Sequence, residues 1–126
     1  MAHADASGPA EACGQLTVSD STTQDGARVV SVAGELDLDG EMALGPALFS
    51  ALRADPPPRL VVLDLSGLTF CDSSGLNLLL RVRLEAEHRS ITLRLVCPGA
   101  TVLRLLKITG MDTLFDIHDR LEQALA

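Results

Sequence analysis

The sequence predicts an α/β fold, because segments typical of buried strands alternate along the chain with a segment typical of an amphipathic helix. The short apolar run from Leu60 to Leu65 is typical of a strand covered on both faces, as in a parallel sheet. Ser73 to Glu87 repeats leucine at helical spacing, whereas Ile91, Leu93 and Leu95 alternate with polar residues as in a strand. This order predicts right-handed crossovers within a mixed central sheet of about five strands, flanked by about four helices.

The first third of the chain is expected to add two strands. Apolar residues alternate with polar ones from Gln15 to Ser19, which predicts a half-exposed strand. A turn over Ser21 to Gly26 then leads into a valine-rich second strand, Ala27 to Ala33, which would form a hairpin with the first. The second strand ends near the acidic residues Glu35 and Asp37.

A first helix is predicted from about Gly45 to Arg53, because Leu44, Leu48 and Leu52 recur at a spacing of four. Asp37 or Asp39 could cap it, and the Gly45-Pro46 pair is expected near its start, since proline is tolerated in a first turn. Three consecutive prolines, 56 to 58, end the helix before the central strand.

The second predicted helix, Ser73 to Glu87, is the longest. Leu76, Leu79, Leu80 and Leu84 share its expected core face, with Arg81, Glu85 and His88 opposite. After the strand at Ile91 to Leu95, the remaining elements follow in short succession. They are a turn at Cys97 to Gly99, a helix from Ala100 to Ile108 closed by Gly110, a strand near Leu114 to Ile117 and a terminal helix from about Asp119 to Leu125.

A single domain is expected, because 126 residues leave no room for a second core. Residues 1–12, which lack periodicity, are predicted to form a flexible tail, and residues 13–126 the domain. Apolar residues make up 47% of the chain, yet it has three Phe and no Trp or Tyr. The core is therefore expected to be aliphatic.

The net charge of −7 argues against a nucleic-acid partner, since affinity for nucleic acid depends on Lys and Arg that neutralise phosphates. The chain has no apolar run long enough to cross a bilayer, and its first ten residues lack the apolar centre of a signal peptide. A cytoplasmic protein without direct membrane contact, which binds another protein, is the expectation.

Catalytic and metal sites have little support in the sequence. Cys13, Cys71 and Cys97 have no zinc or disulfide spacing and are interpreted as free thiols. His3, His88 and His118 are interpreted as exposed side chains rather than catalytic bases, so no enzyme is expected. The acidic residues Asp112, Asp116 and Asp119 lack the spacing of a calcium loop, and no Walker-type loop is present, so no cofactor is expected.

The segment Asp72-Ser73-Ser74-Gly75 lies where the chain leaves the central strand and begins the long helix. Asp and Ser accept hydrogen bonds from the free N–H groups of a first helical turn, so these residues are explained by capping alone. The same position also exposes a serine hydroxyl, so a functional serine is the second interpretation. The residues themselves leave both interpretations open.

Three segments resemble the bacterial anti-sigma factor antagonists of the STAS domain family, in the order found there. They are Gly34-Glu35-Leu36-Asp37, Asp64-Leu65-Ser66 and Asp72-Ser73-Ser74-Gly75-Leu76, and the resemblance spans about Leu16 to Ala124. It implies a single STAS-like domain in which Ser73 is phosphorylated. It also implies that the end of the strand carrying Asp37 joins the partner surface. The partner-binding residues expected on this basis are Asp37, Asp72, Ser73, Ser74, Gly75 and Leu76.

The resemblance also implies the partners. The unphosphorylated form would bind an anti-sigma factor that is also a serine kinase, which supplies ATP and Mg, and would thereby free a sigma factor. A serine phosphatase would reverse the modification. Asn77 and Cys71 depart from the family pattern, which usually has glycine and a larger apolar residue there. An alternative is a STAS subunit that docks on a membrane transporter without a phosphorylation cycle.

Overall fold

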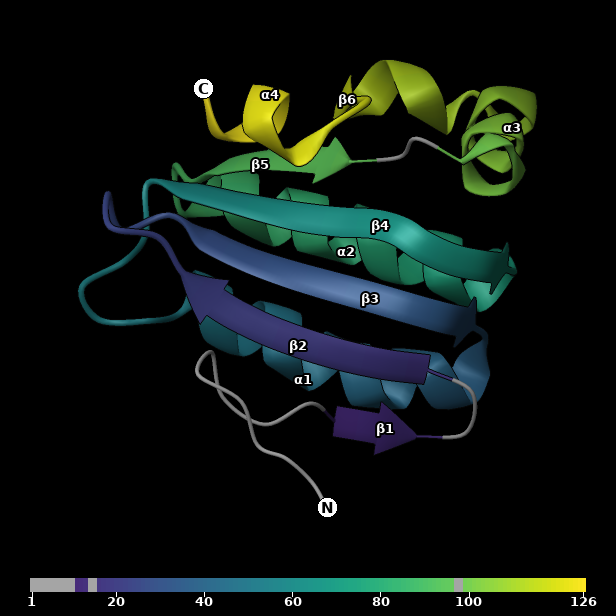
Figure 1. Ribbon diagram of the computed structural model, residues 1–126, viewed down its shortest axis with the longest axis horizontal. Coiled ribbons are helices and arrows are strands. Elements are labelled where there is room, and N and C mark those ends of the chain that lie inside the picture. Colours follow the sequence, from purple (N-terminus) through teal and green to yellow (C-terminus); the bar gives the residue numbers. More distant parts are fainter. Residues whose placement is uncertain (1–10, 14–15, 97–98) are drawn as a thin grey trace.

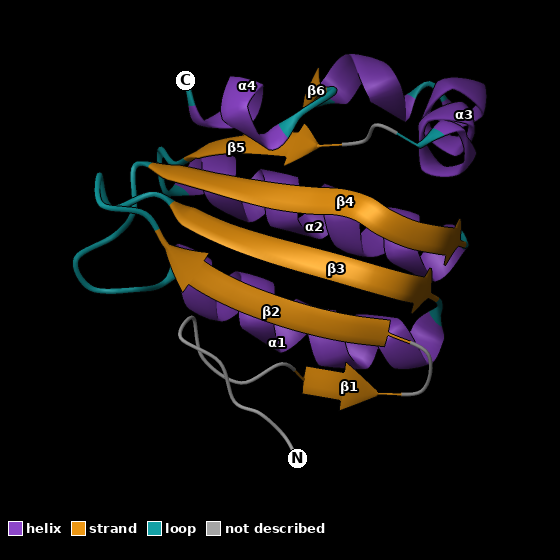
Figure 2. Ribbon diagram, in the orientation of Figure 1, coloured by secondary structure: helices purple, strands orange, loops and turns teal. Residues whose placement is uncertain are grey.

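The computed structural model describes residues 11–13, 16–96 and 99–126. These residues form an α/β fold with six strands, four α-helices and one 3-10 helix, so the predicted fold class is confirmed (Figure 2). The strands are β1 (Glu11–Cys13), β2 (Leu16–Thr22), β3 (Arg28–Leu36), β4 (Leu60–Cys71), β5 (Thr92–Val96) and β6 (Asp116–His118). The helices are α1 (Leu38–Leu52), α2 (Ser73–His88), α3 (Ala100–Thr109), the 3-10 helix η1 (Met111–Leu114) and α4 (Leu121–Leu125).

The strands form one mixed sheet whose spatial order follows the chain from β1 to β6 (Figure 1). β2 pairs antiparallel with both β1 and β3, and the predicted hairpin brings Thr22 opposite Arg28. β3, β4, β5 and β6 run parallel, and α1, α2 and α3 lie in the connections between them. Most of the predicted tail, residues 1–12, lies outside the described residues, but Glu11 and Ala12 belong to β1.

Two helices cover one face of the sheet. α1 and α2 lie side by side behind it in Figure 1 and enclose the main core. The largest fully buried side chains there are all leucine or valine, as the composition predicts. On the opposite face, α4 covers part of the sheet, where Ala124 joins a smaller apolar cluster with Val29, Val62 and Val96.

The first helix begins at Leu38 rather than near Gly45, so its predicted start is wrong. Asp37 caps this earlier start, and Pro46 lies inside the helix on its exposed side. An internal proline loses one helical hydrogen bond, but a cap and a buried leucine stripe offset that loss. Gly45 lies against α2, where a Cβ built on it would be 3.6 Å from Leu78 Cδ1, an ordinary contact distance.

The central strand β4 continues to Cys71, well past its predicted end at Leu65. One extra residue is accommodated in β4 between the pairs Ser31–Asp64 and Ala33–Gly67, which is a β-bulge. Asp64 Oδ1 accepts hydrogen bonds from the Ser66 amide (3.0 Å) and hydroxyl (2.6 Å) at this bulge. A Cβ on Gly67 would lie 2.8 Å from that of Ala33, so glycine allows the strands to stay paired beyond the bulge.

The long helix agrees with the prediction except in one part of its core face. α2 begins at Ser73 and extends one residue beyond Glu87. Leu76 and Leu79 are buried as expected, but Leu84 is 60% exposed. The side of α2 that faces the sheet carries Val82 rather than Leu84.

The C-terminal elements differ by a few residues from those expected. α3 ends at Thr109 and is capped by Gly110, as predicted. The left-handed φ of 77° at Gly110 suits a glycine cap. β6 and α4 both begin two residues later than predicted, at Asp116 and Leu121. The turn expected at Cys97 to Gly99 lies mostly outside the described residues. Across the described ranges, no helix has the length and apolar character that a membrane span needs.

Candidate functional site

The candidate site lies where two neighbouring parallel strands end together. Leu36 of β3 and Cys71 of β4 are paired in register, and each strand passes into its helix through one aspartate, Asp37 or Asp72. The Asp72 amide donates a hydrogen bond to the Leu36 carbonyl oxygen at 3.2 Å, which ties the two connections together. The end of β3 that carries Asp37 therefore lies beside the start of α2.

Both aspartates cap helices. Asp37 Oδ1 accepts a hydrogen bond from the Gly40 amide at 2.9 Å, and Asp72 Oδ1 accepts from the Ser74 and Gly75 amides at 2.9 and 3.4 Å. Each has the extended backbone that an N-cap requires. The capping function is therefore performed by Asp72, which leaves the two serines that follow it with no need to cap.

We expect the Asp72→Ala variant to lower the free energy of unfolding by about 1 kcal/mol, because it leaves two first-turn amides without a partner. Asp72→Asn keeps a capping oxygen and should lie close to the wild type. Urea denaturation of the two variants measures the difference, and an equal loss in both would contradict a capping role for Asp72.

Ser73 is the first residue of α2 and its side chain is exposed, whereas Ser74 is half-buried. At this helix entrance the Ser73 side chain is open to solvent, where another molecule can approach it. Asp37 and Asp72 are half-buried beside it. Ser73 is therefore accessible and lies directly after the capped start of α2.

Gly75 and Leu76 have a different place in the site, because both are buried. A Cβ on Gly75 would lie 2.7 Å from Cys71 Sγ and 2.8 Å from Leu36 Cγ, closer than real contacts allow. The absence of a side chain lets α2 approach the ends of both strands. These two residues thus position Ser73 rather than offering side chains to a partner.

Cys71 is buried directly beneath this helix turn. Burial, together with the negative charge of Asp72, raises the pKa of its thiol to about 11. The contribution of this thiol to stability is intact below about pH 9, its ordinary pKa, and is lost as the pH rises through 11. At neutral pH Cys71 is an unreactive apolar side chain, in agreement with the sequence interpretation.

Sequence reasoning missed an apolar surface next to the site. Leu38 and Met42, on the first two turns of α1, are 61% and 69% exposed, and Phe70 at the end of β4 is 45% exposed. The signal was present: Leu38 and Met42 are one turn apart but fall outside the stripe of Leu44 and Leu48 that faces the core.

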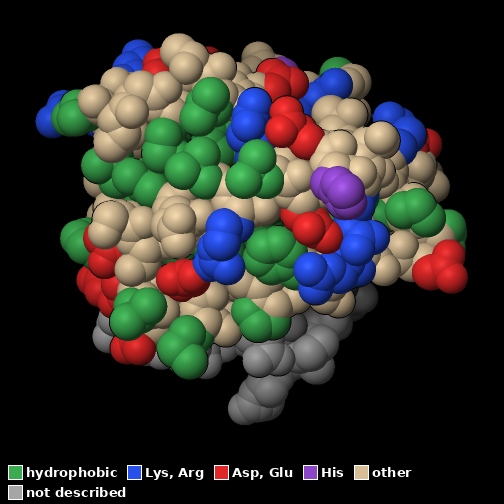
Figure 3. Space-filling view, turned by 180° about the vertical axis from the view of Figure 1, so that it is seen from behind, with side chains coloured by type: hydrophobic (Ala, Val, Ile, Leu, Met, Phe, Trp, Pro, Cys, Tyr) green, Lys and Arg blue, Asp and Glu red, His purple; other side chains and the backbone are tan. Residues whose placement is uncertain are grey.

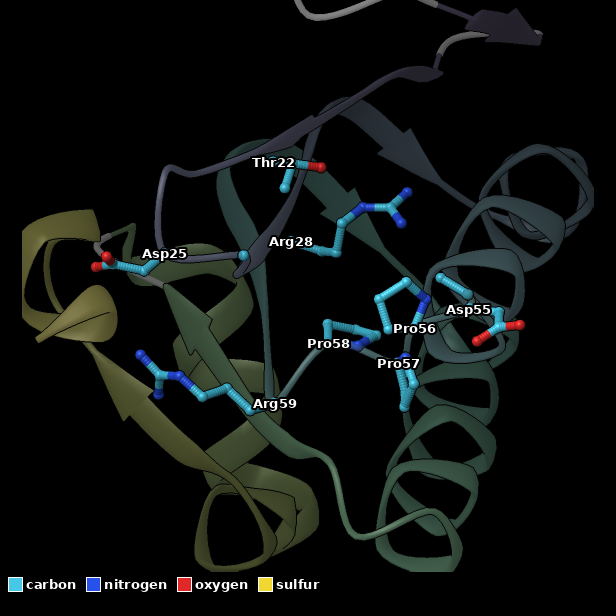
Figure 4. A pocket seen from close by; sticks show the side chains of 10 residues that line it. Thr22, Asp25, Arg28, Asp55, Pro56, Pro57, Pro58 and Arg59 are labelled. Carbon is cyan, nitrogen blue, oxygen red and sulfur yellow. The ribbon is translucent and has the colours of Figure 1, made fainter.

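A hollow lies at the end of the sheet opposite to Ser73 (Figure 4). It has a volume of about 530 Å³ and is lined by the β2–β3 turn and by the proline segment that precedes β4. Arg28, one of its lining residues, is already paired with Asp20. Because β3 spans nine residues, the hollow and Ser73 are separated by about 30 Å.

Among the residues that the structure describes, the side chains that catalysis or metal binding would need do not gather at Ser73. His88 is the last residue of α2, about 22 Å along the helix from Ser73. His118 instead contacts Asp116, with Nε2 and Oδ1 2.9 Å apart. In the part of the chain that the structure describes, no group of three or more His, Cys, Asp or Glu residues is arranged to hold a metal ion.

The chain is similar in sequence and fold to proteins of a known family. Residues 19–123 match the family model described as "Mlab, STAS domain". The anti-sigma-F factor antagonist RsfB of Mycobacterium tuberculosis is 34% identical over 110 residues, which cover 87% of this chain and 85% of RsfB. The crystal structure of an anti-sigma factor antagonist from Mycobacterium paratuberculosis superimposes with a TM-score of 0.78 at 28% identity, covering 87% of this chain and 91% of that one.

More distant structures share the fold alone. SpoIIAA, an anti-sigma factor antagonist solved in unphosphorylated form, has a TM-score of 0.65 at 20% identity, covering 84% of this chain and 91% of its own. SpoIIAA of Bacillus has also been solved in phosphorylated form, with a TM-score of 0.66. A sulfate transporter family protein of Wolinella succinogenes has a TM-score of 0.69 at 16% identity, covering 82% and 84% of the two chains.

The family model matches most of the chain. The chain's sequence is similar to that of one anti-sigma factor antagonist, and its fold to that of another, over most of the same residues. The chain therefore belongs to the STAS domain family of anti-sigma factor antagonists, which are regulators and not enzymes.

Proposed function

We propose that this chain is a cytoplasmic partner-switching regulator whose binding is controlled by phosphorylation of Ser73. In the unphosphorylated form it binds an anti-sigma factor that is also a serine kinase, and a sigma factor is released. The kinase supplies ATP and Mg, and a serine phosphatase restores the binding form. The observation that carries this proposal is the exposed Ser73 hydroxyl on a helix turn whose cap is supplied by Asp72.

A phosphoryl group on Ser73 would change the surface more than the fold. The Ser74 and Gly75 amides, which could otherwise bind an anion, already donate to Asp72. The added charge of about −1.5 to −2 would remain in solvent, next to the Asp72 carboxylate. The free energy of unfolding should therefore change little, because the phosphate neither gains these donors nor enters the core.

A partner that covers Ser73 would meet a large cost. Burying a phosphate requires the removal of its hydration shell, which costs several kcal/mol unless the partner supplies matching positive groups. The half-buried carboxylates of Asp37 and Asp72 add to the negative charge at the same place. Phosphorylation thus opposes complex formation directly, at the centre of the proposed contact surface.

The comparisons support this proposal over transporter docking. RsfB, which shares the most sequence of the proteins described above, is named as an antagonist of an anti-sigma factor. SpoIIAA, which shares the fold, has been solved with and without phosphorylation. The likeness to a transporter family protein is one of fold at 16% identity.

The direct test is incubation with candidate anti-sigma factor kinases from the same organism and Mg-ATP, followed by mass mapping. We expect one phosphoryl group, on the peptide that carries Ser73. Ser73→Ala should receive none, while Ser74→Ala, the matched control one residue away, should be modified normally. Modification of the Ser73→Ala variant would place the phosphoryl group on another residue and overturn Ser73 as the switch. Absence of modification in the wild type with all of these kinases would favour transporter docking instead.

A further inference from the structure

Apolar residues on the outer side of α1 form a defined surface, which we call the α1 patch: the exposed Leu38, Met42 and Pro46 and the half-buried Phe49. They line a shallow hollow of about 430 Å³, bordered by Glu41 of α1, by Arg53 directly after α1 and by Arg81 of α2. Figure 3 shows this helical face, where apolar side chains lie among charged ones. Single exposed leucines are ordinary, but two large apolar side chains one turn apart beside a hollow indicate a contact surface.

The α1 patch is close to Ser73 because of the way the two helices begin. Leu38 follows Asp37 as Ser73 follows Asp72, and the strands before them end in register. An ion pair between Glu41 and Arg81 joins the two helices further along. Packed helices lie about 8–10 Å apart, whereas a standard interface covers about 800 Å² of each partner, so one protein that covers Ser73 also reaches Leu38.

The charge around the patch indicates what kind of surface fits it. Glu35 and Asp39 are exposed on either side of Leu38 in the sequence, and Glu41 follows one turn later. The half-buried carboxylates of Asp37 and Asp72 lie at the same end of the sheet. Arg53 and Arg81 border the hollow farther from Leu38, and Arg81 is paired with Glu41. A complementary surface therefore has an apolar centre, with Lys or Arg side chains on the side that meets Glu35, Asp39 and the Ser73 site.

We propose that Leu38 and Met42 are the apolar anchor of the complex, held in a basic-rimmed apolar pocket of the same anti-sigma factor. This inference rests on the proposed function and divides the interface into two parts. The anchor supplies affinity through apolar burial, and Ser73 supplies regulation through charge. Because the anchor is on α1 and Ser73 is on α2, substitutions affect the two parts separately.

The test compares exposed apolar residues near the site with equally exposed ones elsewhere. Calorimetric titration is carried out with the purified anti-sigma factor and four variants. Leu38→Ser and Met42→Ser should each weaken binding about tenfold, since each removes a large apolar side chain from the contact. Leu84→Ser and Ile108→Ser, at residues that are 60% and 75% exposed, should bind like the wild type. Thermal unfolding checks that all four remain folded.

The acidic rim predicts a kinetic effect of its own. Asp39→Asn should lower the association rate a few-fold at low salt and leave the dissociation rate unchanged, because rim charges steer the encounter. Asp25→Asn, an exposed carboxylate in the turn at the opposite end of the sheet, is the matched control and should have no effect. Equal effects of the two variants would overturn the proposed basic rim of the partner.

Failure of the anchor is distinguishable from failure of the switch. If Leu38→Ser and Met42→Ser bind as tightly as the two controls, the anchor is overturned, even if Ser73→Asp still weakens binding. If the α1 patch serves a second copy of this chain, sedimentation will show a dimer that Leu38→Ser dissociates, with anti-sigma binding unchanged, and the anchor is again overturned. If the wild-type chain binds no anti-sigma factor, both proposals fall.

Discussion

Ser73→Asp is expected to weaken the complex with the anti-sigma factor by about 100-fold, which corresponds to about 2.7 kcal/mol. The substitution places a permanent negative charge on the first residue of α2, where the wild type has an exposed neutral hydroxyl. A partner that covers this position must desolvate the new carboxylate next to Asp72, and like charges at an interface cost several kcal/mol. Calorimetric titration of wild type and variant gives the ratio of dissociation constants.

Two controls separate charge from size and from position. Ser73→Asn has nearly the same shape as the aspartate variant without its charge, so it should retain most of the affinity. Ser50→Asp adds the same charge at an exposed position on α1, about 18 Å along the helix from Leu38, and should bind like the wild type. If the asparagine and aspartate variants at position 73 lose equal affinity, the effect is steric and the electrostatic account is wrong.

Gly75→Ala is expected to lower the free energy of unfolding by about 1–3 kcal/mol, although alanine is the better helix former. The new methyl group would overlap Cys71 Sγ and Leu36 Cγ, and both side chains are buried among other core residues. Relief requires a shift of α2 away from the strand ends, which also moves Ser73. Urea denaturation measures the loss.

Gly45 supplies the matched control because it is also a buried helical glycine. Its Cβ would meet only Leu78 Cδ1, at 3.6 Å, so Gly45→Ala should be neutral or stabilising by about 0.5–1 kcal/mol. Cys71→Ala should partly rescue Gly75→Ala, because it removes one of the two overlaps, and a double-mutant cycle measures this coupling. Additive effects of the two substitutions would contradict direct contact between these residues.

The position of Ser73 was predictable because several local signals agree there. An apolar strand, an aspartate cap and a leucine-rich helix follow one another directly, so α2 begins at the predicted residue. Family resemblance then favoured a functional serine over a capping serine, which the residues alone did not. The structure assigns the cap to Asp72, so capping does not require Ser73, and phosphorylation of Ser73 stays a prediction.

The start of α1 was not predictable from local signals. Gly45 and Pro46 both disfavour a helix interior, yet the helix passes through them, because Asp37 caps it and the glycine lies against α2. That packing depends on residues far along the chain. The extension of β4 through the bulge at Gly67 has a similar cause, since it depends on close contact with Ala33 of the neighbouring strand.

The apolar surface on α1 was missed for the same reason. The helix was predicted to begin near Gly45, so Leu38 and Met42 were placed before it. Their spacing of one helical turn, on the side away from the core, could therefore not be recognised. Leu84 shows the converse error, since its spacing fits the core face of α2 but the sheet lies against the neighbouring side. Periodicity gives the faces of a helix, and only packing decides which face is covered.

The most direct test of the switch is the affinity of one protein sample before and after phosphorylation confined to Ser73. The chain is phosphorylated to completion by its kinase and purified away from it, and each form is titrated into the anti-sigma factor by calorimetry. The account predicts that the phosphorylated form binds at least about 100-fold more weakly, with an unchanged unfolding temperature, and that phosphatase treatment restores binding. Equal affinities of the two forms would contradict it.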